Sequence, residues 1–201
     1  NNLEPFDVLR VGKWPEGVAS FGGKIWVACS GFDNSEYDYD TAALYVYDPS
    51  SGTLDSLVFS EGVNLQDVIG WSNYVYALGT GDYAARWGTL YKVDPEALRV
   101  VDSLSFPNHS PGILELKGDT LVITGWDGAV FFVDPSSLSI LDSLQLGEGI
   151  MGAIPYSGGV AFTRFSSASE NWLLFVEGGE LTDSAALGLG VGAGEGLYLE
   201  E

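Results

Sequence analysis

The sequence predicts an all-β fold, and two observations carry the prediction. A phrase of 13 or 14 residues occurs three times, as "YDPSSGTLDSLVF" at 47–59, "VDPEALRVVDSLSF" at 93–106 and "VDPSSLSILDSLQL" at 133–146. After its second aspartate, apolar residues alternate with mainly small or polar ones, which is the period of a strand with one buried face. No window of about 12 residues shows the apolar stripe of a helix.

The repeat extends along the chain with a long period. Alignment on the aspartate gives Asp7, Asp55, Asp102, Asp142 and Asp183, at spacings of 40 to 48 residues. A period of this length predicts that one supersecondary unit is repeated.

Three further strands are expected in each complete repeat, ahead of the strand that carries the aspartate. The first is "EGVASF", "LQDVIG", "GILEL" or "MGAIPY", the second "KIWVAC", "NYVYAL", "TLVIT" or "GVAFT", and the third "ALYVYD", "TLYKVD", "AVFFVD" or "WLLFVE". β-Branched and aromatic residues dominate these segments, as they do in strands.

Turn residues separate these strands. Pairs such as Gly22-Gly23 and Ser72-Asn73 suit a tight hairpin between the first and second strands. Asp48-Pro49 and its counterparts in the next two repeats suit a turn between the third and fourth, because aspartate accepts bonds from the backbone ahead and proline presets φ. Each repeat is therefore expected to form four antiparallel strands.

Four-stranded antiparallel units at this period are typical of the blades of a β-propeller, where each sheet buries both faces against its neighbours. We predict a single propeller domain over residues 1–201, with complete blades at about 12–59, 60–106, 107–146 and 147–188. A stacked β-solenoid is the alternative architecture.

Two expected strands have no place in these blades. Residues 6–11 read as a fourth strand without its first three, and residues 195–201 as a first strand without a continuation. Three explanations are open: the chain is part of a larger ring, the ring closes irregularly, or another chain completes it. Unpaired strand edges promote association, so the last of these predicts a homo-oligomer or filament.

One stretch resembles a known repeat family. The segments "WPEGVASFGGKIWVACSG" and "ALYVYDPSSGTLDSL" are similar to the blades of YVTN-type propellers of bacterial and archaeal surface and periplasmic proteins. The resemblance covers residues 6 to about 146 most clearly. It implies a propeller with a noncatalytic recognition or surface role, and an extracellular, cell-surface or periplasmic location. The signature tetrapeptide itself is replaced by Trp26-Val27-Ala28-Cys29.

The charge of the chain limits its partners. The sequence has 8 basic and 28 acidic residues, a formal net charge of −20, so its electrostatic field repels nucleic acid and anionic membranes. No apolar run reaches the roughly 18 residues of a transmembrane helix, so membrane insertion is not expected. The single cysteine, Cys29, lies among apolar strand residues and is expected to be buried.

Blade topology places the irregular loops on one face, which we call the loop-rich face. Loops that vary over a regular scaffold are where binding residues usually lie. Aromatic planes stack on sugars or peptides while polar groups orient them, so a protein or glycan ligand is expected there. The predicted ligand-binding residues are Trp14, Tyr83, Arg86, Trp87, His109, Trp126, Asp127 and Arg164. Packing of the tryptophans between blades and internal ion pairs of the arginines are the alternatives.

Two other kinds of site are predicted on these loops. Asp33, Asp38 and Asp40 offer clustered oxygen ligands for calcium, although the spacing of an EF-hand loop is absent and a solvated acidic loop is the favoured interpretation. Asn108 begins the glycosylation sequon Asn-His-Ser. No cofactor other than calcium is expected.

Three functions follow from these features. The first is a noncatalytic extracellular or cell-surface propeller that binds a protein or glycan, since no catalytic motif is found and His109 is the only histidine. The second is a subunit of a surface layer or filament that assembles by strand pairing. The third is a calcium-dependent, lactonase-like hydrolase, in which Asp67 and Glu115 on inner strands hold the metal, although Ser20 and Ile154 at comparable positions supply no ligand.

Overall fold

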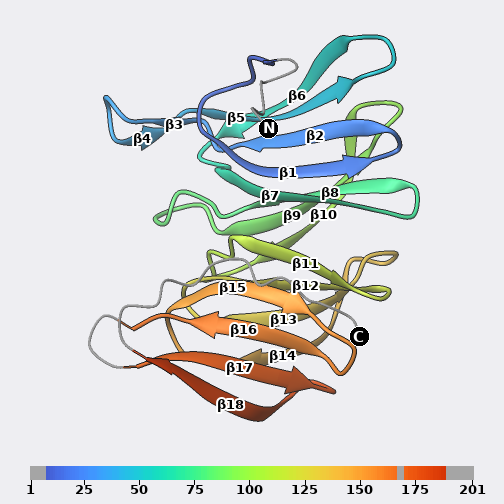
Figure 1. The fold of residues 1–201 in the computed structure, drawn as a ribbon. Coiled ribbons are helices and arrows are strands. Elements are labelled where there is room, and N and C mark those ends of the chain that lie inside the picture. Colours follow the sequence, from blue (N-terminus) through green and yellow to red (C-terminus); the bar gives the residue numbers. More distant parts are fainter. Residues whose placement is uncertain (1–7, 167–169, 189–201) are drawn as a thin grey trace, which may run out of the picture.

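The protein is a set of four antiparallel sheets with a small hairpin added to the first. The computed structural model describes residues 8–166 and 170–188 (Figure 1). Within these ranges there are four sheets of four strands and one sheet of two, and no helix, hence none that could cross a membrane. The all-β prediction of four-stranded antiparallel blades is confirmed.

Each four-stranded sheet is one blade, and its strands lie in chain order. Blade 1 consists of β1 (Pro15–Phe21), β2 (Lys24–Cys29), β5 (Thr41–Asp48) and β6 (Thr53–Glu61). Blade 2 consists of β7 (Leu65–Trp71), β8 (Tyr74–Gly79), β9 (Gly88–Asp94) and β10 (Arg99–Phe106). Blade 3 consists of β11 (Ile113–Lys117), β12 (Thr120–Thr124), β13 (Ala129–Asp134) and β14 (Ser139–Gln145). Blade 4 consists of β15 (Ile150–Pro155), β16 (Val160–Arg164), β17 (Asn171–Glu177) and β18 (Glu180–Gly188).

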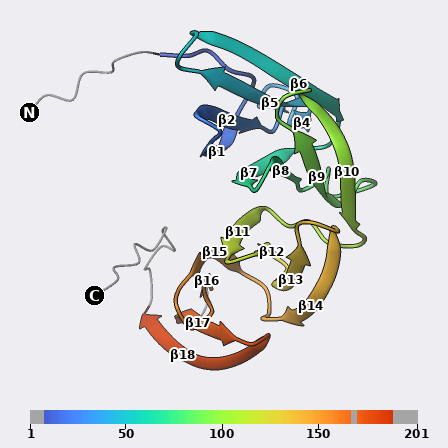
Figure 2. The same ribbon diagram turned by 90° about the vertical axis from the view of Figure 1, so that its right-hand side faces the viewer.

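The four blades follow one another along an arc (Figure 2). The first strand of each blade lies on the inner side of the arc and the fourth on the outer side, where β6, β10, β14 and β18 form its rim (Figure 2). The hairpin of β3 (Phe32–Asp33) and β4 (Asp38–Tyr39) projects from the connection between β2 and β5 (Figure 1).

The hydrophobic core is divided into three clusters, one between each pair of successive blades. Strand β8 shows how this arises. Its side chains alternate, so that Val75 and Ala77 pack against blade 1 while Tyr76 and Leu78 pack against blade 3. All four are completely buried. A middle strand with both faces covered is apolar at successive positions, as the sequence of β8 is.

The repeated aspartate lies on the outermost strand of each blade. Asp55, Asp102, Asp142 and Asp183 each accept a hydrogen bond from the backbone N–H of the following serine, at 2.7 to 2.8 Å. In blades 2, 3 and 4 the strand register also shifts just before this aspartate. The carboxylate therefore binds a backbone donor beside a bulge that bends the outer strand.

The predicted aspartate turns are present, and one of them also joins two blades. Asp134 Oδ1 accepts a bond from the N–H of Ser136 at 2.8 Å, which closes the turn between β13 and β14. The Pro135 carbonyl of this turn accepts bonds from the Tyr76 hydroxyl at 2.8 Å and from the Lys92 ammonium at 3.1 Å. Lys92 is buried and lies 4.4 Å from the centroid of the Tyr74 ring, so its charge is held by carbonyls and aromatic faces.

The strand expected at 6–11 is not found in its described part. Residues 8–11 form no strand, and β1 begins at Pro15. A fourth strand needs a third strand to bond to, and in the described residues β6, β10, β14 and β18 already fill that place in all four blades. Residues 6 and 7, and the strand expected at 195–201, lie outside the described residues.

The interblade core predicts that two leucine-to-alanine substitutions change the free energy of unfolding by very different amounts. Leu78→Ala removes a completely buried side chain from the cluster between blades 2 and 3. It should lower the free energy of unfolding by about 2–5 kcal/mol, from lost transfer energy and a residual cavity. Leu141→Ala on the outer strand β14, where the side chain is exposed, should change it by less than about 0.5 kcal/mol. Urea denaturation followed by tryptophan fluorescence measures both, and equal effects would contradict the two-sided core.

Candidate binding surface

The irregular loops lie together on one side of the molecule. The β3–β4 hairpin and the connection between β8 and β9 project to the left in Figure 1, whereas the tight turns between β1 and β2 and between β7 and β8 lie on the right. The regular blades thus act as a rigid support for one variable surface.

A cluster of aromatic rings covers the blade 1 end of this surface. Its members come from three chain segments, and we call it the aromatic patch: Trp14, Phe32, Tyr37, Tyr39 and Tyr83. Phe32 lies at the centre, with its ring centroid 5.3 Å from that of Trp14, 5.5 Å from that of Tyr37 and 5.2 Å from that of Tyr39. Tyr83 extends the patch from blade 2, 6.2 Å from Tyr39.

The outer members of the patch are exposed. Tyr37 is 84% exposed, Tyr83 59% and Trp14 50%. Tyr39 is half-buried, and this burial, with the neighbouring Tyr83 ring, raises the pKa of its hydroxyl. Isolated exposed aromatics are ordinary on protein surfaces, whereas a contiguous exposed group of rings is a candidate interaction surface.

The backbone is strained at these exposed rings. Trp14, Tyr37 and Tyr83 have φ angles of 52°, 57° and 60°. Bulky residues avoid this left-handed region, and each such residue costs about 1–3 kcal/mol. Strain of this kind persists only where the surroundings hold it, and it concentrates at functional sites.

The hairpin that carries the patch is held by its own aspartate. Asp33 Oδ1 accepts bonds from the N–H of Ser35 at 2.9 Å and from its hydroxyl at 2.5 Å, and the Asp33 carbonyl accepts the N–H of Tyr37 at 2.8 Å. Across the hairpin Phe32 pairs with Tyr39, which brings both rings to one side. The local sequence therefore shapes the hairpin part of the patch, whereas Trp14 and Tyr83 come from segments outside the hairpin.

Lys13 pairs with two carboxylates of the acidic loop that was predicted to bind calcium. Its ammonium lies 2.6 Å from Asp33 Oδ2 and 3.3 Å from Asp40 Oδ2. The hydrogen bond from Lys13, followed by those from Ser35, holds the pKa of Asp33 well below its ordinary value of 3.8. Asp38 instead accepts the N–H of Tyr39 at 2.8 Å. In residues 8–166 and 170–188 no three His, Cys, Asp or Glu side chains form a metal-binding group, so the predicted calcium ligands do not converge.

A second group of predicted residues lies on the loops of blade 3. His109 Nδ1 is 2.7 Å from Asp127 Oδ2, which ties the connection between blades 2 and 3 to the turn between β12 and β13. Asp127 Oδ1 also accepts the N–H of Ala129 at 3.2 Å. Trp126 is more than half exposed, and its ring lies 6.4 Å from that of Phe165. These side chains form a second, smaller group on the loops of blade 3.

Among the described residues, the two arginines donate hydrogen bonds to neutral groups and form no ion pair, although the charge of Arg86 adds to the backbone hydrogen bonds that lower the pKa of Asp82. Arg86 donates from Nη1 to the Ser60 hydroxyl at 2.8 Å, and Arg164 donates from Nη1 to the Leu146 carbonyl at 3.2 Å. Trp87 beside Arg86 is 38% exposed and does not belong to the patch. Asn108 is exposed, and its glycosylation stays a prediction.

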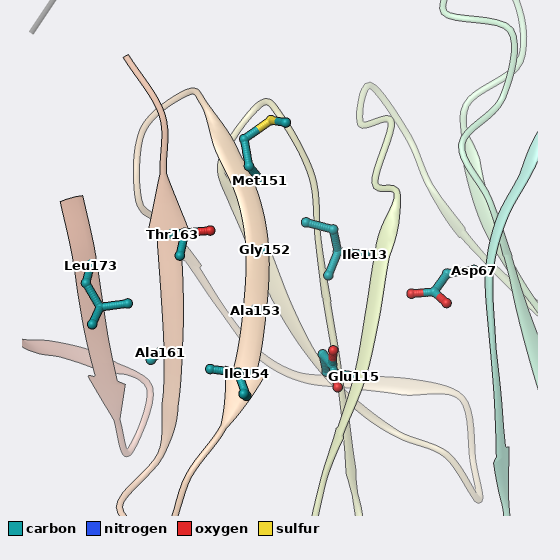
Figure 3. Close-up of a pocket in the computed structure, with 10 residues that line it drawn as sticks. All are labelled: Asp67, Ile113, Glu115, Met151, Gly152, Ala153, Ile154, Ala161, Thr163 and Leu173. Carbon is teal, nitrogen blue, oxygen red and sulfur yellow. The ribbon is translucent and has the colours of Figure 1, made fainter. Parts of the chain in front are cut away.

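The inner side of the arc holds a shallow hollow, lined by Asp67, Glu115, Thr163 and apolar residues of β11, β15, β16 and β17 (Figure 3). The Asp67 carboxylate accepts hydrogen bonds from the backbone there. Its Oδ2 accepts the N–H of Leu114 in blade 3 at 2.9 Å, and its Oδ1 accepts the N–H of Val68 at 2.8 Å. The lining contains two carboxylates, those of Asp67 and Glu115, and the described residues hold no group of three His, Cys, Asp or Glu side chains that could bind a metal.

Comparison with solved structures agrees with the blade architecture. The chain is similar to the WD40 domain of coronin from Toxoplasma gondii, with a TM-score of 0.64 and 15% sequence identity, over 89% of this chain and 48% of that one. The fold is that of a β-propeller. The chain spans about half the length of that structure. Neither a scan against protein-family models nor a search of curated proteins found a match, and the YVTN-type resemblance stays a prediction.

The structure brings together some of the predicted residues and adds others. Trp14 and Tyr83 meet in the patch, and His109, Asp127 and Trp126 meet on blade 3. Phe32, the centre of the patch, was missed, although its place at the start of an aromatic hairpin segment is a signal that could have found it.

Lys13 offers a direct test of the electrostatics of the patch. Lys13→Met should raise the pKa of Asp33 toward its ordinary value of 3.8, while the Ser35 bonds keep it lower than that. A depressed carboxylate pKa stabilises the folded state above the ordinary pKa, and this contribution is lost as the pH falls toward the folded value. Carboxyl NMR titration measures the shift, with Lys24→Met as the control. An unchanged Asp33 pKa in Lys13→Met would show that the ion pair does not form.

Proposed function

We propose that this chain is a noncatalytic recognition module that binds a protein partner through the aromatic patch. The observation that carries the proposal is the group of exposed rings, Trp14, Tyr37 and Tyr83, which is contributed by three separate segments and held in strained backbone. Aromatic side chains lose little conformational entropy on binding and dominate the energy of protein interfaces.

The shape of the surface favours a protein over a small molecule. The patch lies on a projecting hairpin, which suits a broad partner surface rather than an enclosed ligand (Figure 1). A propeller fold of the WD40 type by itself supports many functions, so the proposal rests on the patch and not on the fold. Stacking of sugars on the same rings is the second candidate, supported by the polar groups of Asp38 and Asn34 beside them.

The charge of the chain indicates the chemistry of the partner. With a net charge of −20, the surface attracts a partner that has basic residues around an apolar contact. Lys13 is one cation beside the two carboxylates of Asp33 and Asp40, so it cancels only part of the acidic field around the patch. Rim charges of this kind act mainly on the association rate, and binding should slow as salt is added.

We place this function outside the cytoplasm, at the cell surface or in the periplasm. The YVTN-type resemblance supports that location, and a large excess of acidic residues suits a solvated surface in cation-rich water. Assembly by pairing of terminal strands is not part of this proposal, because residues 8–11 form no strand and residues 195–201 are not described.

The patch predicts a specific loss of binding. A binder selected from a peptide-display library against the 201-residue chain should bind about tenfold or more weakly to the double variant Tyr37→Ala, Tyr83→Ala, because two exposed anchors are removed. Leu141→Ala, an exposed apolar residue on the outer strand, serves as the matched control and should bind as the unchanged chain does.

Binding that survives the double variant at full strength would place recognition elsewhere on the molecule. A glycan array run with the same three proteins tests the second candidate. Glycan binding that depends on Tyr37 and Tyr83, with no peptide selected, would change the partner class from protein to carbohydrate.

A further inference from the structure

The Glu16 carboxylate lies beside the aromatic patch, at a bulge in the first strand of blade 1. The register between β1 and β2 shifts between Pro15 and Gly17, and Glu16 is the extra residue between them. A bulge of this kind re-aims a side chain and is frequent beside functional sites. Blades 2 and 4 have a bulge at the same place, where the extra residues are the neutral Gln66 and Met151. Of these three bulges, only that of blade 1 carries a charge.

No basic side chain in the described part of the chain neutralises Glu16. The ion pairs within residues 8–166 and 170–188 are formed by Lys13 and His109, and neither pairs with Glu16. The residue is exposed as a whole, yet partial burial of its carboxylate raises the pKa of this group, and a hydrogen bond from the Gln66 amide offsets only part of the rise. The same amide donates to Asn64 Oδ1 at 2.7 Å, which fixes its position. An accessible carboxylate in such surroundings is stabilised when a cation approaches it.

Two tyrosine rings of the patch lie within electrostatic reach of this carboxylate. Tyr39 on β4 and Tyr83 in the connection between β8 and β9 are on the same side of the molecule (Figure 1), with ring centroids 6.2 Å apart and planes inclined at 50°. Burial and the Tyr83 ring raise the pKa of the Tyr39 hydroxyl, and the charge of Glu16 adds to that shift. Burial also raises the pKa of the Cys29 thiol, again with a contribution from Glu16. Both groups are therefore neutral at neutral pH and leave the charge of Glu16 uncompensated.

The cations nearest to these rings along the chain are engaged elsewhere. Lys13 pairs with two carboxylates of the acidic loop, at 2.6 Å and 3.3 Å. Arg86, which follows Tyr83 in the connection between β8 and β9, donates to the Ser60 hydroxyl at 2.8 Å. A cation brought by a partner therefore meets no competition from these two side chains.

We propose that Glu16, Tyr39 and Tyr83 form a subsite for a positively charged side chain, an arginine or a lysine, of the protein that binds the aromatic patch. This inference rests on the proposed function and deepens it, because it names the side chain that the partner presents beside its apolar contact. The Glu16 carboxylate pairs with the guanidinium or ammonium group, and the faces of the two rings attract the same charge. Because charge carries part of the contact, added salt should weaken it.

NMR titration with single blocked amino acids tests the subsite without a partner protein. The probes are arginine and lysine, each acetylated at the α-amino group and amidated at the carboxyl group, and citrulline blocked in the same way, which has the shape of arginine without the charge. Arginine and lysine should shift the ring signals of Tyr39 and Tyr83, and citrulline should bind about tenfold or more weakly, because it cannot form the ion pair. The tighter of the two cations shows whether a guanidinium or an ammonium group fits better. Equal binding of all three probes, or no shift with any of them, would overturn the subsite.

A matched pair of variants tests the role of the carboxylate. Glu16→Gln removes the charge with little change of shape, and it should bind blocked arginine about tenfold or more weakly. Glu96→Gln makes the same change at an exposed residue in the turn between β9 and β10, and it should bind blocked arginine as the unchanged chain does. Circular dichroism checks that both variants keep their strand content. Unchanged binding by Glu16→Gln, or an equal loss in both variants, would show that the charge of Glu16 does not hold the probe.

A peptide selected by display against the whole chain separates this inference from the proposed function. It should contain an arginine or a lysine and should bind Glu16→Gln about tenfold or more weakly. A peptide that loses binding to the double variant Tyr37→Ala, Tyr83→Ala but binds Glu16→Gln at full strength would keep the patch as the recognition surface and overturn the subsite alone. A peptide that is unaffected by either change would contradict the proposed function itself.

Discussion

The fold depends on the burial of both faces of every middle strand. In β8, Val75 and Ala77 fill the core with blade 1, and Tyr76 and Leu78 fill the core with blade 3. No blade has a core of its own, so each is stable only beside a neighbour.

Polar bonds then set how successive blades join. The buried Lys92 ammonium and the Tyr76 hydroxyl of blade 2 both donate to the Pro135 carbonyl in the turn of blade 3, and on the inner side Asp67 accepts the Leu114 N–H. These polar groups are buried or half-buried and each has a hydrogen-bond partner, as is usual for polar groups in a protein interior. The few basic residues of an acidic chain are thus used in part as structural links.

On this scaffold, the β3–β4 hairpin contributes no residue to the three core clusters of the described part of the chain. The β3–β4 hairpin is shaped by Asp33 and its bonds to Ser35, and Lys13 anchors it to the segment before β1. Strained backbone at Trp14 and Tyr37 is tolerated there because the contacts around Phe32 hold these residues in place. The aromatic patch is therefore a feature of several segments acting together.

The sequence by itself determined the blades, because the alternation of apolar residues and the Asp-Pro turns act over a few neighbouring positions. It also identified Trp14 and Tyr83 as surface residues, from their place in the loops. Only the tertiary structure showed that Phe32 lies in the same group of rings as these two residues. It also showed that Lys13 pairs with Asp33 and Asp40, and that residues 8–11 form no strand. These contacts join segments distant along the chain, and local patterns contain no information on which partner such a side chain meets.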